Sequence, residues 1–353
     1  MVVTPPVRAG IIGVTGYSGT ELLRILLHHP HLEVTYLAAR QVTEATPVGT
    51  LLPSFAACSG TLLVHPFCET DCVDACDVVF VALPSGVSGD IALSLSNKGV
   101  VVIDLSGDLR LPKEVYEQWY PHRSPLPADQ APPVYGLSEW FSHAVTSATL
   151  VSNPGCYATA VELALLPIVQ SPWMDARQSV VVDAKSGTTG AGKSPAAHLT
   201  FSEMTENFLA YRVGRHQHLP EIEQTLTQLT GKSVSICMTT QLLPVARGIF
   251  ATCYVPLVGP VSDLELRTLY EDAYRQTVFV SMLPPGSWPD LHSVRGTNQC
   301  LLSIHVDARN NMLQVFSVID NLQKGAAGQA VQNCNRIFGW PEISGLSVVA
   351  SAL

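Results

Sequence analysis

The sequence is poor in charged residues and has no block of basic ones. Asp, Glu, Lys and Arg make up only 14% of its 353 residues, whereas about a quarter is usual. The formal net charge is −9, from 20 basic and 29 acidic residues. This balance argues against nucleic acid or an anionic membrane as a partner and favours a small-molecule substrate. A hydrophobic content of 47% excludes an intrinsically disordered chain.

Long apolar runs, targeting signals and a disulfide framework are also missing. No run approaches the ~20 residues of a membrane-spanning helix, so we expect no membrane. Residues 1–7 carry neither a basic cluster nor an apolar signal core. Nine scattered cysteines fit a reducing compartment, and we expect a cytoplasmic protein. Because sparse charge leaves apolar surface to be covered, we expect a homodimer or homotetramer.

Three cysteines recur every four residues, at Cys68, Cys72 and Cys76. This spacing would place three thiols on one helix face and could indicate a metal site. A zinc site would require further ligands at a comparable distance, and the sequence offers none. We therefore interpret these cysteines as small hydrophobic residues in a helix interface and predict no metal.

The first half of the chain alternates between strand-like and helix-like segments. Continuous apolar runs at 7–14, 34–39, 77–83 and 99–105 are typical of parallel strands that helices cover on both faces. Residues 21–29 have helical spacing. The fold class is therefore α/β, and we predict a Rossmann-type dinucleotide-binding domain over residues 1–151.

The second half has longer strands that alternate less regularly with helices. The runs at 300–309 and 311–320 predict an antiparallel hairpin with its turn at Arg309–Asn311. We predict an α+β catalytic and dimerisation domain with a mixed, largely antiparallel sheet over residues 152–320. Small and apolar residues at helical spacing after Asp320 predict a C-terminal helix, within 321–353, that returns to the dinucleotide-binding domain.

A glycine-rich segment, Gly13, Gly16 and Gly19, follows the first predicted strand and opens a helix. Glycine permits the tight turn and the close approach of backbone N–H groups to a phosphate at the helix N-terminus. The second strand ends near Arg40, where NAD-binding folds usually have an acid. Because an arginine there can pair with a 2′-phosphate, we favour NADP(H) over NAD. The alternative is a plain turn beside a surface arginine.

Cys156 lies in the sharpest local motif, residues 152–159 (SNPGCYAT). A Pro-Gly turn delivers this cysteine to the start of an apolar helix, where the N-terminal N–H groups stabilise a thiolate. We predict a nucleophile, against the alternative of an inert packing cysteine. His216 and His218 supply imidazoles for acid–base chemistry within a short stretch.

Residues 187–194 (GTTGAGKS) match the phosphate-binding loop of nucleotide triphosphatases. Pro195 follows at once, and a helix tolerates proline only in its first turn. We therefore prefer a backbone loop that contacts the substrate or its phosphate, and keep a nucleotide-hydrolysing P-loop protein as the outside alternative. A plain glycine-rich turn also remains open.

Together these motifs resemble the N-acetyl-γ-glutamyl-phosphate reductase family, within the aspartate-semialdehyde dehydrogenase superfamily. The resemblance extends over nearly the whole chain: GVTGYSGTELLRIL at 13–26, ALPSG at 82–86, IDLSGDLRL at 103–111, YGLSE at 135–139, SNPGCYATA at 152–160, DAKSGTTGAGK at 183–193, HQHLPEI at 216–222, LLPVARGI at 242–249 and DNLQKGAAGQAVQN at 320–333. Three positions depart from the family pattern. Ser85 and Gln241 stand where the family often has histidine, and Gln217 where it often has arginine.

The resemblance implies a reaction and a set of site residues. Cys156 would attack the acyl phosphate of N-acetyl-L-glutamyl 5-phosphate, and NADPH would reduce the thioester to N-acetyl-L-glutamate 5-semialdehyde, a step of arginine biosynthesis. His218 would be the acid and base, with His216 as support. The cofactor-binding residues would be Gly13, Thr15, Gly16, Tyr17, Ser18, Gly19, Arg40, Pro84, Ser85, Ser186, Gly187, Asn321 and Lys324. The substrate-binding residues would be Arg110 as a phosphate clamp, with Asn153, Arg212, Arg215 and Arg247.

Other functions remain open at this point. Within the superfamily, aspartate semialdehyde or another acyl phosphate is the competing substrate. A thiol acyltransferase or hydrolase would use Cys156 and His218 without a nicotinamide, and a redox-sensing NADP-binding protein would use the fold without turnover.

Overall fold

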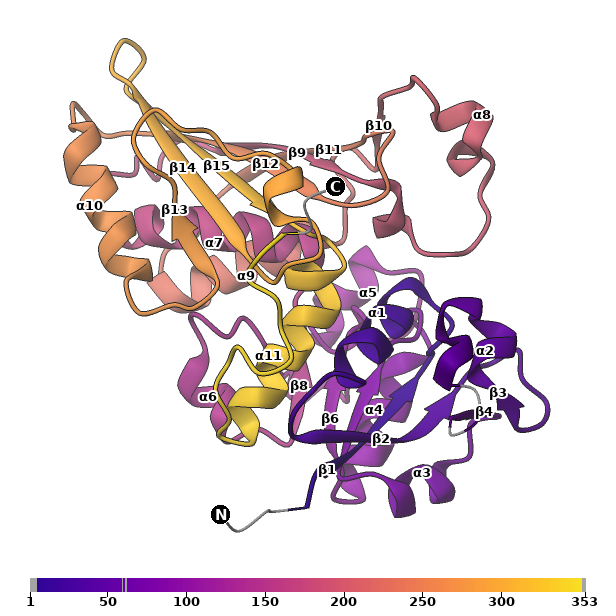
Figure 1. The fold of residues 1–353 in the computed structure, drawn as a ribbon. Helices are drawn as coiled ribbons and strands as arrows, with labels where there is room; N and C mark the ends of the chain where they lie inside the picture. Colours follow the sequence, from indigo (N-terminus) through magenta and orange to yellow (C-terminus); the bar gives the residue numbers. More distant parts are fainter. Residues whose placement is uncertain (1–4, 59, 61, 351–353) are drawn as a thin grey trace. The chain divides into compact units, whose positions relative to one another are not determined.

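The chain folds into two compact units (Figure 1). The computed structural model describes residues 5–58, 60 and 62–350. Unit 1 comprises the chain up to Pro154 together with Ala326–Leu346, and unit 2 comprises Gly155–Gly325 together with the residues from Ser347 onward. The sequence-based boundaries lie after 151 and 320, whereas the contacts divide the chain after 154 and 325. The first boundary between the two units therefore lies directly before Gly155 and Cys156.

Unit 1 is built on an eight-stranded sheet in the order β3-β4-β2-β1-β5-β6-β8-β7. Its neighbouring strands are parallel except for the antiparallel pair β3 and β4. Their bounds are β1 Val7–Ile12, β2 Leu32–Ala38, β3 Thr46–Pro47, β4 Leu63–His65, β5 Val78–Val81, β6 Val101–Asp104, β7 Val134–Tyr135 and β8 Leu150–Ser152. Strand β5 is wholly buried and β1 is buried from Ala9 to Ile12, as their apolar sequences predict. The Rossmann-type fold class is confirmed.

The helices of unit 1 lie in the connections between its strands, except α11, which comes after the last strand of unit 2 in the chain (Figure 1). They are α1 Tyr17–Leu26, α2 Val48–Leu51, α3 Glu69–Ala75, α4 Ser88–Asn97, α5 Lys113–Trp119, α6 Ser142–Thr146 and α11 Gly328–Ile337. Helix α1 begins four residues before the predicted position, because Gly16 caps it in an extended conformation and accepts the Thr20 N–H at 2.8 Å. It ends at Leu26, after which the N–H groups of His28 and His29 bond three residues back.

The cysteine repeat falls at helix α3 and its two ends. Cys68 precedes the helix and Cys76 follows it. Cys72 and Cys76 are buried in the core of unit 1, which confirms the packing interpretation for these two, whereas Cys68 is partly exposed. In the described part of the chain, no three His, Cys, Asp or Glu side chains are placed to hold a metal ion.

Unit 2 contains a seven-stranded mixed sheet in the order β10-β11-β9-β12-β15-β14-β13. The pairs β9–β11 and β13–β14 are parallel, and the others are antiparallel. Their bounds are β9 Val180–Ser186, β10 Leu209–Tyr211, β11 Ile236–Leu242, β12 Ile249–Pro256, β13 Val280–Met282, β14 Cys300–Asp307 and β15 Met312–Ile319. The predicted hairpin is β14–β15, and Asn311 takes a positive φ of 46° at its turn. The predicted mixed, largely antiparallel sheet is confirmed.

Helix α7 (Cys156–Gln170) packs on this sheet, against β12 and β15, and also contacts α9 (His218–Thr230) and α10 (Asp263–Tyr274). All of its residues from Tyr157 to Val169 are buried. Pro167 has no N–H, so the carbonyl of Leu163 loses its helical donor. The hydroxyl of Tyr274 donates to this carbonyl instead.

The segment after Asp320 is less regular than the single helix that we predicted. Gln323–Ala327 form a π-helical turn, and α11 begins only at Gly328. The cause is a wide hydrogen bond from the Gly325 N–H to the Asp320 carbonyl, at 3.0 Å. Among the described residues, no helix combines the length and apolarity needed to cross a bilayer.

Candidate active site

The glycine turn of unit 1 is packed too tightly for side chains. Gly13 has a φ of +93°, and a Cβ there would lie 2.4 Å from the Ala82 carbonyl oxygen. A Cβ at Gly19 would lie 2.2 Å from the Gly13 carbonyl oxygen. The turn leads directly into α1, whose first N–H groups, at Tyr17, Ser18 and Gly19, have no partner one turn earlier within the helix. Such a turn fits the phosphates of a dinucleotide.

Arg40 lies just beyond the end of β2 and its side chain is exposed. Next to it, the side-chain amide of Gln41 donates to the Thr15 hydroxyl at 2.7 Å. This bond joins the end of β2 to the glycine turn within unit 1. An arginine at this strand end can meet a 2′-phosphate, whereas an acid would repel it.

The turn at Pro84 and Ser85 is anchored by a buried carboxylate. Asp108 accepts the N–H groups of Gly86 at 2.8 Å and Gly89 at 3.0 Å, together with the Tyr116 hydroxyl at 2.7 Å. The Ser85 hydroxyl accepts the N–H of Gly107 at 3.2 Å. Serine therefore serves the local turn at this position, where the family often has histidine.

Arg110 and Asn153 are buried in unit 1 and hydrogen-bonded there. Arg110 donates from Nε to the Asn153 carbonyl at 2.8 Å and from one Nη to the Leu105 carbonyl at 3.0 Å. The Asn153 side chain donates to the Ala326 carbonyl and accepts from the Asn333 side chain, both at 3.1 Å. These contacts support a role in holding the segment before Cys156 more than direct contact with substrate.

In unit 2, Cys156 is the first residue of α7 and is half-buried. Gly155 caps the helix with extended backbone and accepts the Thr159 N–H at 2.8 Å. A Cβ at Gly325 would lie 2.8 Å from the Cys156 Cβ, so the Asp320–Gly325 turn packs directly against the cysteine. The N–H groups of a fifteen-residue helix face this position and favour a thiolate.

His218 begins α9 and lies against the glycine before the cysteine. A Cβ at Gly155 would lie 2.3 Å from the His218 Nε2, so only glycine lets the imidazole reach this place. The structure thus brings the predicted nucleophile turn and the predicted acid–base residue together inside one unit. Geometry of this kind suits proton transfer at the cysteine.

His216 lies beside His218, with their ring centroids 4.7 Å apart. Burial is the largest cause of a pKa of about 2 at His216, and the neighbouring His218 and Arg212 act in the same direction. His216 is therefore neutral at physiological pH and cannot act as a proton donor from its charged form. The geometry favours His218 for the acid–base role, with His216 as a neutral residue packed beside it.

Two tyrosines complete the surroundings of the histidines. The Tyr211 hydroxyl donates to the Tyr157 hydroxyl at 3.1 Å, which donates to the Gln241 backbone carbonyl at 3.2 Å. The Tyr157 ring meets the His216 ring edge-on, at 5.1 Å. Burial raises the pKa of both tyrosines, so both remain protonated. No local sequence pattern predicted this pair.

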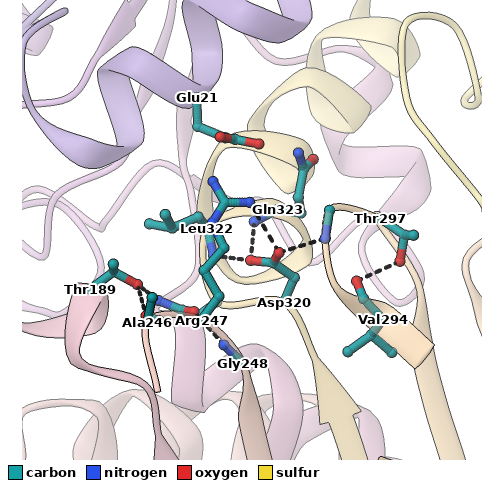
Figure 2. A network of polar contacts seen from close by, with 12 residues as sticks. Glu21, Thr189, Ala246, Arg247, Gly248, Val294, Thr297, Asp320, Leu322 and Gln323 are labelled. Carbon is teal, nitrogen blue, oxygen red and sulfur yellow. Dashed lines mark hydrogen bonds and ion pairs between the residues drawn. The ribbon is translucent and has the colours of Figure 1, made fainter. Parts of the chain in front are cut away.

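The remaining predicted arginines of unit 2 have different surroundings. Arg212 and Arg215 are exposed on the loop before α9, and Arg212 donates to the Gln217 side chain. Arg247 donates to the Asp320 carboxylate at 3.2 Å. Figure 2 shows this carboxylate, which also accepts the N–H groups of Leu322 and Gly296, both at 2.8 Å.

The predicted cofactor residues of unit 2 are largely committed to the fold. The Asn321 side chain accepts the Gly248 N–H at 2.8 Å and donates to the Thr189 hydroxyl at 3.0 Å. The Ser186 hydroxyl donates to the Gly187 carbonyl at 2.9 Å. Lys324 is fully buried, with its Nζ 5.7 Å from the centroid of the Phe279 ring.

The P-loop alternative is wrong. The N–H groups of Gly187, Thr188 and Thr189 donate to the carbonyls of Gly248, Val245 and Ala246, at 2.8 to 3.1 Å. The segment forms a short 3₁₀ turn, Thr188–Ala191, instead of opening a helix. Because these amides are already hydrogen-bonded, they cannot cradle a nucleotide phosphate. The same bonds weigh against our preferred backbone phosphate loop and favour the glycine-rich turn.

A Rossmann-type unit combined with a mixed-sheet unit that presents a helix-terminal cysteine beside a histidine is typical of nicotinamide-linked dehydrogenases. Two family models match the chain: the semialdehyde dehydrogenase NAD binding domain over residues 8–148 and the semialdehyde dehydrogenase dimerisation domain over residues 156–321. The chain belongs to the semialdehyde dehydrogenase family and, within it, to the N-acetyl-gamma-glutamyl-phosphate reductases, which are oxidoreductases of amino-acid biosynthesis.

The second part of that assignment follows from full-length relatives. The chain is 43% identical to the N-acetyl-gamma-glutamyl-phosphate reductase of Brevibacillus brevis, and the match covers 97% of this chain and 99% of that enzyme. It is 42% identical over 345 residues to the enzyme of the same name from Laribacter hongkongensis. This confirms the family resemblance inferred from the motifs.

Solved structures agree on the fold. Aspartate semialdehyde dehydrogenase II from Vibrio cholerae superposes with a TM-score of 0.71 over 95% of this chain and 99% of that one, at 16% identity. The aspartate semialdehyde dehydrogenase of Candida albicans, solved with NADP, gives 0.66 over 94% of this chain at 16% identity. At these identities the similarity concerns the architecture alone.

The sequence did not predict the structural roles of two site residues. Glu221, which we named only as part of the 216–222 motif, accepts the Gly155 N–H at 2.7 Å. Gly325 packs against Cys156. The three-residue spacing of His218 and Glu221 places them on one face of a helix and was the available signal for Glu221; nothing local distinguishes Gly325 from other glycines.

Proposed function

We propose that the protein is an NADPH-dependent N-acetyl-L-glutamyl 5-phosphate reductase that works through a thioester on Cys156. The observation that carries the proposal is the placement of Cys156 at the start of α7 with His218 packed on Gly155. The chain that holds this arrangement is 43% identical, over 97% of its length, to an enzyme named N-acetyl-gamma-glutamyl-phosphate reductase.

The chain's own residues supply the covalent chemistry. The Cys156 thiolate attacks the carbonyl carbon of the acyl phosphate, the bond from that carbon to the phosphate oxygen breaks, and a thioester forms on Sγ. The departing phosphate takes up a proton. A bound reduced nicotinamide supplies the hydride that the thioester carbon requires.

His218 handles the proton of the second half-reaction. It protonates the oxygen of the tetrahedral species on Cys156 and takes that proton back as the carbon–sulfur bond breaks. The aldehyde leaves and the thiolate is restored at the end of α7, where the helix N–H groups stabilise it. The N–H groups of the first turn of α7 also suit the developing oxyanion.

The finer assignments of ligand residues belong to the same proposal. The glycine turn fits a dinucleotide, and Arg40 supports NADP over NAD, since a guanidinium pairs with a 2′-phosphate. Arg212 and Arg215 are the exposed arginines nearest in sequence to His218, and we assign them to the substrate carboxylate. Arg247 remains a third candidate, held by Asp320.

We further propose a cytoplasmic homodimer. The matched dimerisation model covers most of unit 2. One face of the unit 2 sheet exposes apolar side chains, among them Val181, which is 44% exposed. Phe250 and Phe316 meet on neighbouring strands, and Trp288, 53% exposed, packs on Phe316. The nine cysteines, all within the described residues, form no disulfide, in keeping with a reducing compartment. Light scattering of the purified protein would distinguish the dimer from a homotetramer.

The reverse reaction tests the function. Purified protein with NADP, inorganic phosphate and N-acetyl-L-glutamate 5-semialdehyde should generate the NADPH absorbance band, and omission of phosphate (or arsenate) should abolish it. Aspartate semialdehyde at the same concentration should react far more slowly. If aspartate semialdehyde supported reduction of NADP and N-acetyl-L-glutamate 5-semialdehyde did not, the protein would be an aspartate-semialdehyde dehydrogenase. Turnover of an acyl donor without nicotinamide would assign it to the thiol acyltransferases or hydrolases.

A further inference from the structure

The backbone N–H directly before the nucleophile is bound by a carboxylate from another helix. Glu221, in the first turn of α9, is buried, with 1% of its surface exposed. Its Oε1 accepts the Gly155 N–H at 2.7 Å. A bond from a carboxylate to a backbone amide is charge-assisted, and such bonds are among the stronger ones in proteins.

This bond joins the two helices that carry the proposed chemistry. Gly155 is the N-cap of α7, and Cys156 is that helix's first residue. His218 is the first residue of α9, three positions before Glu221, so their side chains share one face of α9. The His218 Nε2 lies 2.3 Å from the point where a Cβ would stand on Gly155. The N-cap residue of α7, Gly155, is therefore held by the Glu221 carboxylate and covered by the His218 ring.

We propose that Glu221 is a positioning residue for Cys156. By fixing the Gly155 peptide it keeps the nucleophile turn in register with His218 and leaves the following N–H groups of α7 to face the thiolate. The role lies in the hydrogen bond and its length, because the negative charge of Glu221 by itself disfavours a thiolate nearby. This inference rests on the function proposed above.

Two conservative variants separate the hydrogen bond from the charge. E221Q removes the charge but keeps an oxygen at the same distance, able to accept the Gly155 N–H. E221D keeps the charge but withdraws the carboxylate by one carbon–carbon bond, about 1.5 Å. If the bond positions the cysteine, E221D is the damaging change and E221Q the mild one.

Glu223 offers a matched control on the same helix. It is half-buried, and its carboxylate likewise accepts one backbone N–H, that of Ile236, at 3.3 Å. That bond ties α9 to β11, not to the nucleophile turn. E223D therefore withdraws a carboxylate from a comparable backbone N–H without touching Gly155.

The first readout needs no substrate. Alkylation of Cys156 by iodoacetamide at neutral pH, followed by peptide mass spectrometry, reports thiolate reactivity in the folded protein. E221D should slow alkylation several-fold, whereas E221Q and E223D should not slow it. Hydrogen exchange at the Gly155 amide should accelerate in E221D only. Unchanged alkylation in E221D, or equal slowing in E221Q and E221D, would overturn the proposal.

The second readout uses turnover of the semialdehyde. E221D should lower kcat by about 10- to 100-fold, since a displacement of about 1 Å at a reacting group can have this effect, with KM nearly unchanged. E221Q should restore most of kcat. If E221D changed KM but not kcat, Glu221 would be a purely structural residue. The same would follow if E221D and E223D lowered the thermal unfolding temperature equally and had equal kcat values. Absence of turnover in the unaltered protein would refute the proposed function, while the alkylation result would still decide the role of Glu221.

Discussion

His216 accepts the backbone N–H of His218 on its Nδ1, at 3.2 Å. A nitrogen that accepts this bond carries no proton, so the neutral ring has its hydrogen on Nε2. Protonation would place an N–H against another N–H and would charge a buried ring. The bond therefore disfavours the protonated ring, as does burial, which is the largest cause of the lowered pKa of His216.

The buried neutral state of His216 predicts acid sensitivity. The pKa is about 2 in the folded protein and 6.5 ordinarily. Below pH 6.5 the unfolded chain binds a proton that the folded chain does not, so the free energy of unfolding falls by up to about 1.4 kcal/mol per pH unit. Above pH 6.5 neither state is protonated and the full stability is present. Urea unfolding at pH 7.5 and pH 5.5 measures the difference.

H216N is the informative variant, because its side-chain oxygen can still accept the His218 N–H. Between pH 7.5 and pH 5.5, the free energy of unfolding should fall by about 1 kcal/mol less in H216N than in the unaltered protein. Replacement of the exposed His143 by asparagine should leave the pH dependence as it was. An identical pH dependence in H216N and the unaltered protein would show that another group is responsible.

Cys156 is expected to be essential for chemistry but not for cofactor binding. C156A removes the nucleophile while the glycine turn of unit 1 is untouched, so turnover should fall by at least about 10³-fold. NADP affinity, measured by fluorescence titration, should stay within about two-fold of the unaltered protein. Mass spectrometry of the enzyme mixed with acyl phosphate, in the absence of NADPH, should show an acyl adduct on Cys156. Appreciable turnover by C156A would contradict the covalent mechanism.

Arg40 is expected to set the preference for NADP. R40E replaces a partner of the 2′-phosphate with a charge that repels it and that can accept hydrogen bonds from a ribose diol. The Kd for NADP should rise by about 10-fold or more, whereas the Kd for NAD should change little or fall. Fluorescence titration with both nucleotides measures this. Equal weakening of both would show that Arg40 does not read the 2′-phosphate.

Local sequence patterns predicted most of the fold and the centre of the site. Continuous apolar runs marked β1, β5 and β6, and the spacing of turn residues marked the β14–β15 hairpin. The P-loop alternative and the preferred phosphate-contacting loop both fail to predict that the amides of residues 187–189 bond to carbonyls at 245–248, a tertiary arrangement that no local pattern encodes. The Glu221–Gly155 bond joins residues 66 positions apart, so it too follows from the packing of α7 on α9. The start of α1 was placed late because three glycine positions hid the beginning of its helical spacing.

The last prediction concerns the proline inside α7. Because Pro167 has no N–H, the Leu163 carbonyl depends on the Tyr274 hydroxyl. Y274F leaves this buried carbonyl without its donor and should destabilise the protein by about 1–3 kcal/mol. In a P167A background the new alanine N–H can complete the helical bond, so the same change should be milder by about 0.5–1 kcal/mol. The neighbouring Tyr270 hydroxyl donates to the Ala164 carbonyl at 2.6 Å, one residue away from the position that Pro167 affects. Y270F should therefore cost the same in both backgrounds. A double-mutant cycle by urea unfolding measures both couplings, and equal couplings for the two tyrosines would show that Tyr274 does not substitute for the missing N–H.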